Sequence, residues 1–80
     1  MHLEIVTPEK TVFSGEVTLV QLPGEKGSFE ILHNHAPIIS SLKAGTVKYI
    51  TKEGITKNVE INGGVVESRS NNIVVLGEFI

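Results

Sequence analysis

The sequence contains no cysteine and no tryptophan, and its 80 residues include only one tyrosine and three phenylalanines. The absence of cysteine excludes a disulfide framework and any metal centre built on thiolates. So few aromatic side chains also give little support to a sugar-binding β-sandwich, which would need exposed rings. A chain of this length buries about 60–65% of the surface that it exposes when unfolded, so its core is thin. We therefore expect a single domain, residues 1–80.

A predominance of one charge is missing as well. Seven basic and nine acidic side chains leave a formal net charge of −2, and no basic run is present to neutralise a phosphate backbone. This composition argues against nucleic acid as a partner. The start of the chain lacks the charged region and apolar stretch of a signal peptide. The longest apolar runs, such as Ile73–Leu76, are far shorter than the roughly 20 residues of a membrane helix. We expect a soluble, cytoplasmic protein that reaches a membrane only through partner subunits.

Alternation of apolar and polar residues with a period of two dominates the chain and indicates β-strands. Leu3 and Ile5 alternate with polar neighbours near the N-terminus. Residues 45–52 and 55–61 are typical of a hairpin whose arms are joined by Glu53-Gly54. In the second arm, we expect one face to hold Ile55, Lys57, Val59 and Ile61, and the other to hold Thr56, Asn58 and Glu60.

Glycine, proline and asparagine mark the turns between these strands. Residues 36–42 are ambiguous, but Gly45 follows too soon for more than two helical turns, so we interpret them as a strand or an irregular segment. No window shows the helical period. The predicted fold is all-β, a compact β-sandwich or flattened barrel of about eight to ten short strands. The predicted turns or breaks lie at residues 7–10, Ser14-Gly15, residues 24–27, residues 62–64 and residues 70–72.

His33 and His35 are the nearest approach to a metal site in this sequence. Residues two apart on a strand point to the same face, so two imidazoles could bind one ion. Asn34 and Pro37 favour a loop instead, and nothing in the sequence brings a third ligand, His2 or Glu30, to the pair. We therefore predict neither a metal site nor a cofactor.

Other polar groups give no catalytic pattern. Glu4, Glu16, Glu53 and Glu60 fall on expected solvent faces or turns, and no nucleophile accompanies them in a strand–turn–helix context. Gly63-Gly64 is followed by strand-forming valines rather than by a helix N-terminus, which a phosphate cradle requires. A turn or a close backbone approach explains these glycines better. The chain is therefore predicted not to be an enzyme.

A series of short motifs follows a fixed order along this strand-rich background. Their joint order and spacing resemble the N-terminal β-domain of the epsilon subunit of F-type ATP synthases, over nearly the whole chain. The motifs are Phe13-Ser14-Gly15, His35-Ala36-Pro37, Leu42-Lys43-Ala44-Gly45, residues 62–67 and residues 72–76.

This resemblance implies a non-catalytic rotor subunit of the central stalk. Such a domain lies between the gamma subunit and the membrane c ring, on the cytoplasmic side of the energy-transducing membrane, and supports the coupling of ion translocation to ATP synthesis. The resemblance implies c-ring contacts at Glu25, Lys26, Ser28 and Phe29, with Phe29 either an exposed anchor or part of the core. It implies contacts with gamma or the ring, at the same end of the domain, at His35, Ala36, Pro37 and Ile38.

Two departures from the family pattern stand out. Relatives often carry glycines before the His-Ala-Pro motif, where this chain has residues 30–34 without glycine, so the loop lacks their extra flexibility and the resemblance does not assign its conformation. Many members also continue into a C-terminal helical hairpin that inhibits hydrolysis and, in some bacteria, binds ATP. If these 80 residues are the whole gene product, we expect it neither to inhibit nor to sense ATP by that route.

A carrier domain of the lipoyl or biotinyl type is the alternative. Such domains are also small and all-β, and they carry a modified lysine at the tip of a hairpin. Lys52, before Glu53-Gly54, is a lysine in a predicted turn, but the acidic or methionine context of such sites is absent. The intact mass of the chain distinguishes the two readings, because a carrier would gain an adduct on Lys52.

Overall fold

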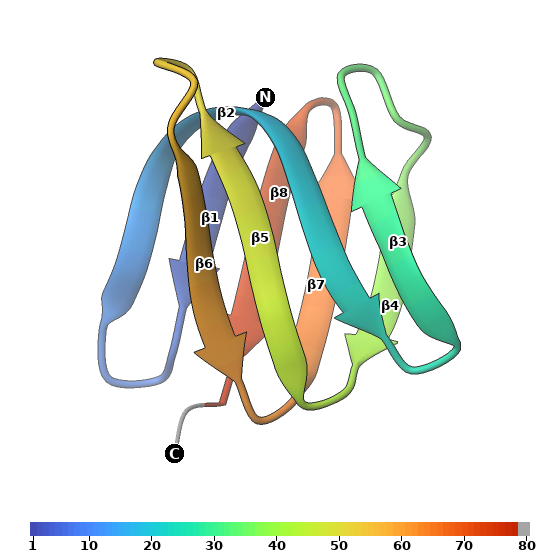
Figure 1. The fold of residues 1–80 in the computed structure, drawn as a ribbon. Helices are drawn as coiled ribbons and strands as arrows, with labels where there is room; N and C mark the ends of the chain where they lie inside the picture. Colours follow the sequence, from blue (N-terminus) through green and yellow to red (C-terminus); the bar gives the residue numbers. More distant parts are fainter. Residues whose placement is uncertain (79–80) are drawn as a thin grey trace.

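The described residues, 1–78, form a protein built of β-strands, as seen in a computed structural model (Figure 1). No helix in this part of the chain is long and apolar enough to cross a membrane. The all-β prediction is therefore confirmed, and the number of strands falls within the expected range. The eight strands are β1 (His2–Val6), β2 (Thr11–Gly24), β3 (Gly27–Ile31), β4 (Ile38–Leu42), β5 (Gly45–Thr51), β6 (Thr56–Ile61), β7 (Gly64–Arg69) and β8 (Asn72–Gly77).

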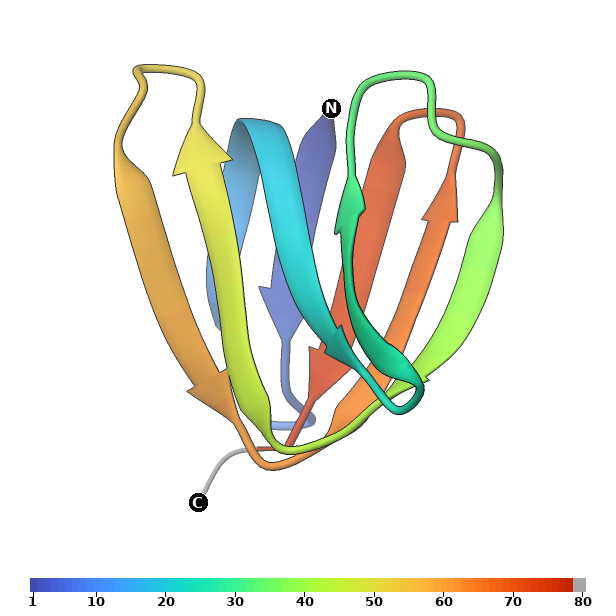
Figure 2. The same ribbon diagram turned by 45° about the vertical axis from the view of Figure 1, so that its right-hand side comes forward.

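The strands form two layers that share β2. The hydrogen-bonded order is β1-β8-β7-β4-β2-β5-β6, while β3 also pairs with β2 and β1 pairs with both β8 and β2. The first part of β2 pairs with β1, and its second part pairs with β3 and β5. One layer thus contains β4, β7, β8 and β1, and the other contains β3, β2, β5 and β6 (Figures 1 and 2). The β1–β8 pair is parallel, whereas the other pairs are antiparallel.

The predicted turn at Ser14-Gly15 is wrong, because both residues lie inside the 14-residue strand β2. A Cβ atom at Gly15 would lie 3.1 Å from Cζ of Phe13, so the glycine leaves room for that ring. The ring of Phe13 packs against Tyr49 of the other layer, with a centroid distance of 4.5 Å. The register with β5 then shifts between Val17 and Leu19. An irregularity of this kind bends a strand, and β2 rises in one layer, bends over the end of the sandwich and descends in the other (Figure 1).

The core lies between the two layers and consists of the inward-facing side chains of both. Tyr49 is 3% exposed, and its burial raises the pKa of its hydroxyl above the ordinary value of 10.0. Removal of this apolar surface from water supplies most of the favourable free energy of folding. The buried apolar residues are Leu3, Ile5, Val17, Val20, Leu22, Ile31, Leu42, Val47, Tyr49, Ile61, Val66, Ile73 and Val75.

The predicted alternation is confirmed at β1, where Leu3 and Ile5 are buried, but only partly at β6. Val59 and Ile61 turn inward, whereas Ile55 is 54% exposed and precedes the strand. The amide of Thr51 donates to the carbonyl of Ile55 at 2.8 Å, so Ile55 belongs to the turn and not to the ladder. The expected inward face therefore begins after this turn.

The remaining expectations about turns are confirmed. Turns or bends interrupt the strands at residues 7–10, 25–26, 62–63 and 70–71. Residues 36–37 are irregular, and strand β4 begins at Ile38, in agreement with the reading of that segment.

Candidate interaction surfaces

The two histidines of the sequence pair lie in the loop between β3 and β4, as Asn34 and Pro37 suggested. The Nδ1 atom of His35 donates to the carbonyl oxygen of Ala36 at 2.7 Å, within the same loop. Across residues 1–78, no group of three histidine, aspartate or glutamate side chains is arranged to hold a metal ion. The structure does not bring these histidines to any third ligand.

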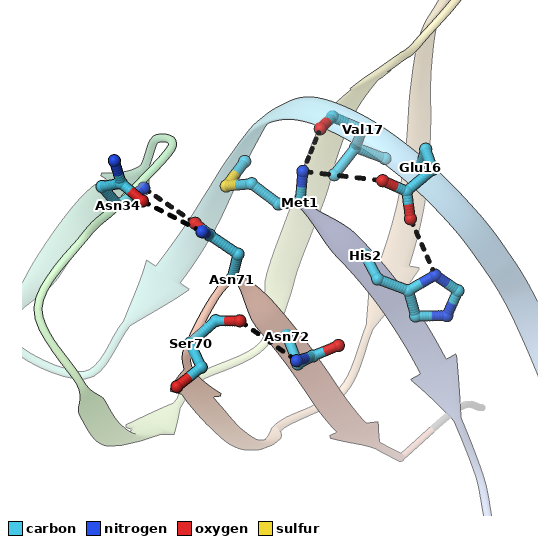
Figure 3. Close-up of polar contacts among 8 residues, drawn as sticks. All are labelled: Met1, His2, Glu16, Val17, Asn34, Ser70, Asn71 and Asn72. Atoms are coloured by element: carbon cyan, nitrogen blue, oxygen red, sulfur yellow. Dashed lines mark hydrogen bonds and ion pairs between the residues drawn. The ribbon is translucent and has the colours of Figure 1, made fainter.

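A different histidine forms the polar cluster that sequence reasoning missed. The Nδ1 atom of His2 lies 3.1 Å from a carboxylate oxygen of Glu16 (Figure 3). Its Nε2 atom lies 3.9 Å from a carboxylate oxygen of Glu4. The N-terminal ammonium donates to the carbonyl of Val17 at 3.3 Å. The signal that could have found the cluster is the pairing of β1 with β2, which places His2 opposite Glu16. The cluster is exposed, so it joins two strands at the surface.

The other carboxylates lie where the sequence predicted. Glu53 is in the exposed turn between β5 and β6, and Glu60 accepts a hydrogen bond from the Thr46 hydroxyl on the solvent face. Gly63 and Gly64 lead into β7, and a Cβ atom on Gly64 would overlap the carbonyl oxygen of Leu76. The predicted close backbone approach is therefore confirmed.

The hairpin between β2 and β3 presents the residues assigned to the c ring. Glu25 and Lys26 form its exposed tip, and Ser28 is exposed in β3. Phe29 is half-buried. One side of its ring packs against the core, and the other side lies at the surface. A shallow hollow of about 300 Å³ lies beside the hairpin, between Phe29 and Ile39 of β4.

The second predicted group lies elsewhere, which corrects one expectation. His35, Ala36 and Pro37 follow the C-terminal end of β3, whereas Glu25 and Lys26 precede its N-terminal end. Strand β3 therefore separates the two groups, and they occupy opposite ends of the molecule (Figure 1). The sequence placed them at one end because neighbouring motifs suggested nearness, although a strand carries the chain away from its preceding turn by about 3.3 Å per residue.

Both groups flank an exposed apolar surface, which we call the apolar outer face. It lies on the solvent side of the β4–β7–β8–β1 layer. Ile39 is 73% exposed and Leu76 is 50% exposed. Strand pairing places three of its members side by side, because Val65 lies opposite Leu76 and Val6 lies beside Leu76. Its members are Val6, Ile39, Val65, Val74 and Leu76.

Acidic residues interrupt this face at defined positions. Glu67 lies opposite both Ile39 and Val74, and Glu4 lies beside Val74 on the other side. Exposed aliphatic side chains gathered on one face mark a candidate protein interaction surface. Sequence reasoning missed it, because four consecutive apolar residues in β8 do not show which of them point inward.

The opposite outer face, on the β3–β2–β5–β6 layer, is polar. Gln21 lies opposite Lys48 and Glu30, and Lys48 lies opposite Asn58. Leu19 and Ile50 are its half-buried apolar members. Its exposed or half-exposed polar members are Thr18, Gln21, Glu30, Thr46, Lys48, Thr56, Asn58 and Glu60.

The fold and these surfaces define a small β-sandwich interaction domain with one apolar and one polar outer face. The sequence model of the ATP synthase delta/epsilon chain β-sandwich domain matches residues 1–80. The chain belongs to this family.

Relatives in bacteria agree with this assignment. The ATP synthase epsilon chain of Pelotomaculum thermopropionicum is 46% identical over 75 residues, which are 94% of this chain and 55% of that protein. The epsilon chain of Bordetella avium is 37% identical over 98% of this chain and 55% of its own length. The chain thus spans about half the length of these relatives. The epsilon chain of Caulobacter vibrioides is 40% identical, and the match covers 98% of this chain and 90% of that one.

Solved structures show the same fold at low sequence identity. A chain of the Euglena gracilis mitochondrial ATP synthase, in a structure of OSCP, F1 and c-ring, matches 94% of this chain with a TM-score of 0.87 and 16% identity, over 48% of its own length. A chain of the Tetrahymena thermophila mitochondrial ATP synthase central stalk and c-ring matches 99% of this chain with a TM-score of 0.79 and 17% identity, over 63% of its own length. The β-sandwich prediction is therefore confirmed.

Proposed function

We propose that residues 1–80 act as one β-domain in the central stalk of an F-type ATP synthase, where they link the gamma subunit to the membrane c ring. The domain itself catalyses no reaction and supports the coupling of ion translocation to ATP synthesis. It meets the membrane only through its partner subunits, on the cytoplasmic side. The observation that carries this proposal is the apolar outer face, on a domain whose family is that of epsilon chains.

The apolar outer face is assigned to the gamma subunit. Exposed aliphatic side chains from four adjacent strands form an extended surface, and such a surface suits a permanent partner that removes it from water. Ile39, at 73% exposure, is the most exposed of them and stands where an anchoring side chain is expected.

The hairpin tip is assigned to the c ring. Glu25 and Lys26 are both charged and exposed, and they project at the end of a narrow hairpin. A charged tip suits the polar loops at the end of membrane helices better than it suits an apolar groove. His35, Ala36, Pro37 and Ile38 lie at the other end of β3 and β4 and complete the contact with gamma. The surface of this domain that contacts gamma thus runs along β4.

The domain is suited to transmit torque because its sheet closes on itself. Strand β2 belongs to both layers, and β1 pairs with both β2 and β8. Neither layer can therefore slide past the other without breaking the backbone hydrogen bonds that join them. A stiff body of this kind passes rotation from one partner to another with little internal deformation.

The carrier alternative is supported only by the position of Lys52 in the exposed turn between β5 and β6. The backbone amide of Lys52 donates to the carbonyl of Glu16 at 3.0 Å, which ties this turn to β2. A swinging arm requires a lysine that stands away from the body. An intact mass equal to that of the unmodified chain would rule out this alternative.

The test of the proposal uses the absence of cysteine, because a single introduced cysteine is then the only thiol of the chain. We compare Ser28→Cys on the hairpin, Val74→Cys on the apolar outer face and Asn58→Cys on the polar face, each assembled with gamma and the c ring. A short thiol-directed cross-linker should join position 28 to a c subunit and position 74 to gamma. Position 58 is the matched control and should join neither.

Two results would overturn the proposal. Equal cross-linking at all three positions would show that contact is random. Failure of the unaltered chain to co-purify with gamma and the c ring from gently solubilised membranes would remove the rotor function altogether.

A further inference from the structure

Two asparagines that are far apart in sequence meet at one end of the domain. The backbone amide of Asn34 donates to Oδ1 of Asn71 at 2.8 Å, and Nδ2 of Asn71 donates to Oδ1 of Asn34 at 3.0 Å (Figure 3). We call this reciprocal pair the Asn34–Asn71 clasp. It joins the loop between β3 and β4 to the turn between β7 and β8 across 37 positions of sequence.

Both residues adopt a backbone conformation that few residue types accept. The φ angle is 63° at Asn34 and 61° at Asn71, in the left-handed region. Asparagine enters this region more readily than most residues other than glycine. Glycine would satisfy the backbone equally well but would bring no side-chain amide. Asparagine at both positions therefore supplies the conformation and the clasp together.

The clasp connects the exposed loop between β3 and β4 to the rest of the domain. Residues 33–37 are all exposed, and Leu32 is 51% exposed, so the loop has little packing against the core. Within residues 1–78 and outside the strand ladders, two hydrogen bonds join residues 32–37 to the rest of the chain. Both are made between Asn34 and Asn71. The other bonds of the loop are internal, from the amide of His35 to Leu32 and from its ring to Ala36.

The other side of the clasp is firmly attached. The carbonyl oxygen of Asn71 accepts the amide of His2 at 2.9 Å, which ties the turn to β1. Nδ2 of Asn72 donates to the carbonyl of Ser70 at 3.1 Å and stiffens the same turn. The clasp therefore connects a loose loop to a point held by two strands.

We infer that Asn71 is a positioning residue, which through Asn34 holds the loop of His35, Ala36 and Pro37 in the conformation that its partner subunit binds. The inference rests on the proposed function, which assigns this loop to the gamma subunit. A loop that is ordered before binding loses less conformational entropy on association, so the clasp raises affinity without touching the partner.

The variants separate the clasp from the backbone. Asn71→Gly keeps the left-handed conformation and removes both bonds of the clasp. Asn34→Gly removes only the bond that Nδ2 of Asn71 donates, because the backbone amide of residue 34 remains. Ser70→Gly is the matched control, because Ser70 also has a left-handed φ of 52° in the same turn and its side chain is not part of the clasp. Asn34→Asp is the conservative variant, since a carboxylate oxygen still accepts from Nδ2 of Asn71. Asn34→Asp combined with Asn71→Asp opposes two acceptors in place of the bond between the side chains and keeps the bond from the backbone amide.

The first measurement is made on the chain alone, as amide order parameters of His35 and Ala36 from nuclear magnetic resonance relaxation. These should be near 0.85 in the unaltered chain, in Ser70→Gly and in Asn34→Asp, and should fall below about 0.6 in Asn71→Gly. Asn34→Gly and the double Asp variant each keep the bond from the backbone amide of residue 34, so their values should lie between these two. The double glycine variant should fall no further than Asn71→Gly, because that change alone removes both bonds.

The second measurement is the affinity of the same variants for gamma and for the c ring. The variants without the clasp should bind the partner of this loop about 5- to 20-fold more weakly, which is the range of one or two ordered side-chain contacts. Ser70→Gly should bind normally. Asn34→Asp should retain most of the affinity, a result that a merely structural loss would not produce.

Three outcomes would decide against the inference. Unchanged order parameters in Asn71→Gly would show that the clasp does not order the loop. Lost order with unchanged affinity for both partners would reject the positioning role. If the unaltered chain bound neither partner, the proposed function would fail and the partner role with it, while the order parameters would still accept or reject the clasp as the element that orders the loop.

Discussion

The two outer faces of the sandwich cover the same core and have opposite character. The apolar outer face of the β4–β7–β8–β1 layer exposes Ile39, Val65, Val74 and Leu76. The opposite layer exposes amide, hydroxyl and charged groups. Both layers bury alternate residues against each other, so the core alone does not explain why one solvent side is aliphatic. The difference is what the proposed partner surface on one of the layers requires.

The edges of the two layers support the same distinction. Strand β6 is an edge strand, and its exposed residues include Lys57 and Glu60. Charged side chains on an edge discourage pairing with another chain. The β6 edge of the polar layer is therefore protected against pairing with another chain.

The largest expected effect comes from a matched pair of leucines, one in the core and one on the apolar outer face. Leu22 is fully buried, so Leu22→Ala should lower the free energy of unfolding by about 2–5 kcal/mol. Leu76 is 50% exposed, so Leu76→Ala should change it by less than about 0.5 kcal/mol. Urea unfolding followed by far-UV circular dichroism measures both values. Similar losses in the two variants would show that Leu76 belongs to the core and would break the comparison.

A pair of glycines compares the backbones of the two layers. A side chain at Gly64, in β7, would strike the carbonyl of Leu76 and push β8 away, so Gly64→Ala should lower the free energy of unfolding by about 2–3 kcal/mol. Gly54, at the tip of the β5–β6 hairpin, has open space around it and a φ of 87°. Gly54→Ala should cost about 1 kcal/mol, from the backbone conformation alone. Thermal and urea unfolding of both variants give the ranking, and a larger loss at Gly54 would contradict it.

Self-association of the isolated chain sharpens the comparison further. Without its partner the apolar outer face remains in water, so the chain should associate weakly at high concentration. Val74→Lys places a charge at the centre of this face and should weaken association by about tenfold or more, a change of about 1.4 kcal/mol. Asn58→Lys, on the polar face, is the matched control and should leave association unchanged. Sedimentation equilibrium measures both, and an equal effect of the two lysines would mean that charge alone is responsible.

The smallest expected effect is the response to alkaline pH. Burial raises the pKa of Tyr49, so above the ordinary value of 10.0 the unfolded chain loses its tyrosine proton before the folded chain does. The folded state then binds more protons than the unfolded state, and stability falls as pH rises. The contribution of the neutral hydroxyl is complete below pH 10.0 and is lost as pH rises through the folded pKa.

Tyr49→Phe separates this effect from that of the lysines. Tyr49 is the only tyrosine of the chain, so absorbance at long ultraviolet wavelengths titrates it directly. The variant should lose part of the alkaline decline in stability, while the control Asn58→Ala should keep it. A tyrosine that titrated at its ordinary pKa would contradict the burial of Tyr49 between the layers.

Much of the fold was predictable because strand alternation and turn residues are local signals. The alternation of Leu3 and Ile5 with polar residues predicted β1, and glycine, proline and asparagine marked most turns. Ser14-Gly15 was misread because its glycine serves ring packing against Tyr49, which lies in the other layer. The same two residues would be a turn in another context, so only the distant contact distinguishes the cases.

The candidate contact residues were predicted as two groups at one end of the domain, and that shared placement was wrong. Glu25 and Lys26 precede β3, whereas His35–Pro37 follow its opposite end. The clasp of Asn34 with Asn71 could not be anticipated, because nothing local relates two residues 37 positions apart. Their partnership depends on β3, β4, β7 and β8 being assembled.

The sequence by itself determined an all-β chain, its turns, its lack of a metal pattern and its resemblance to epsilon chains, since each depends on residues close together or on motif order. The tertiary structure alone decided which of Val74 and Val75 faces the core, where β2 bends and which loops meet. The reason is that strand pairing joins residues distant in sequence, and shifting a strand by one residue exchanges its buried and exposed sides. The apolar outer face, and with it the proposed partner surface, exists only once that register is set.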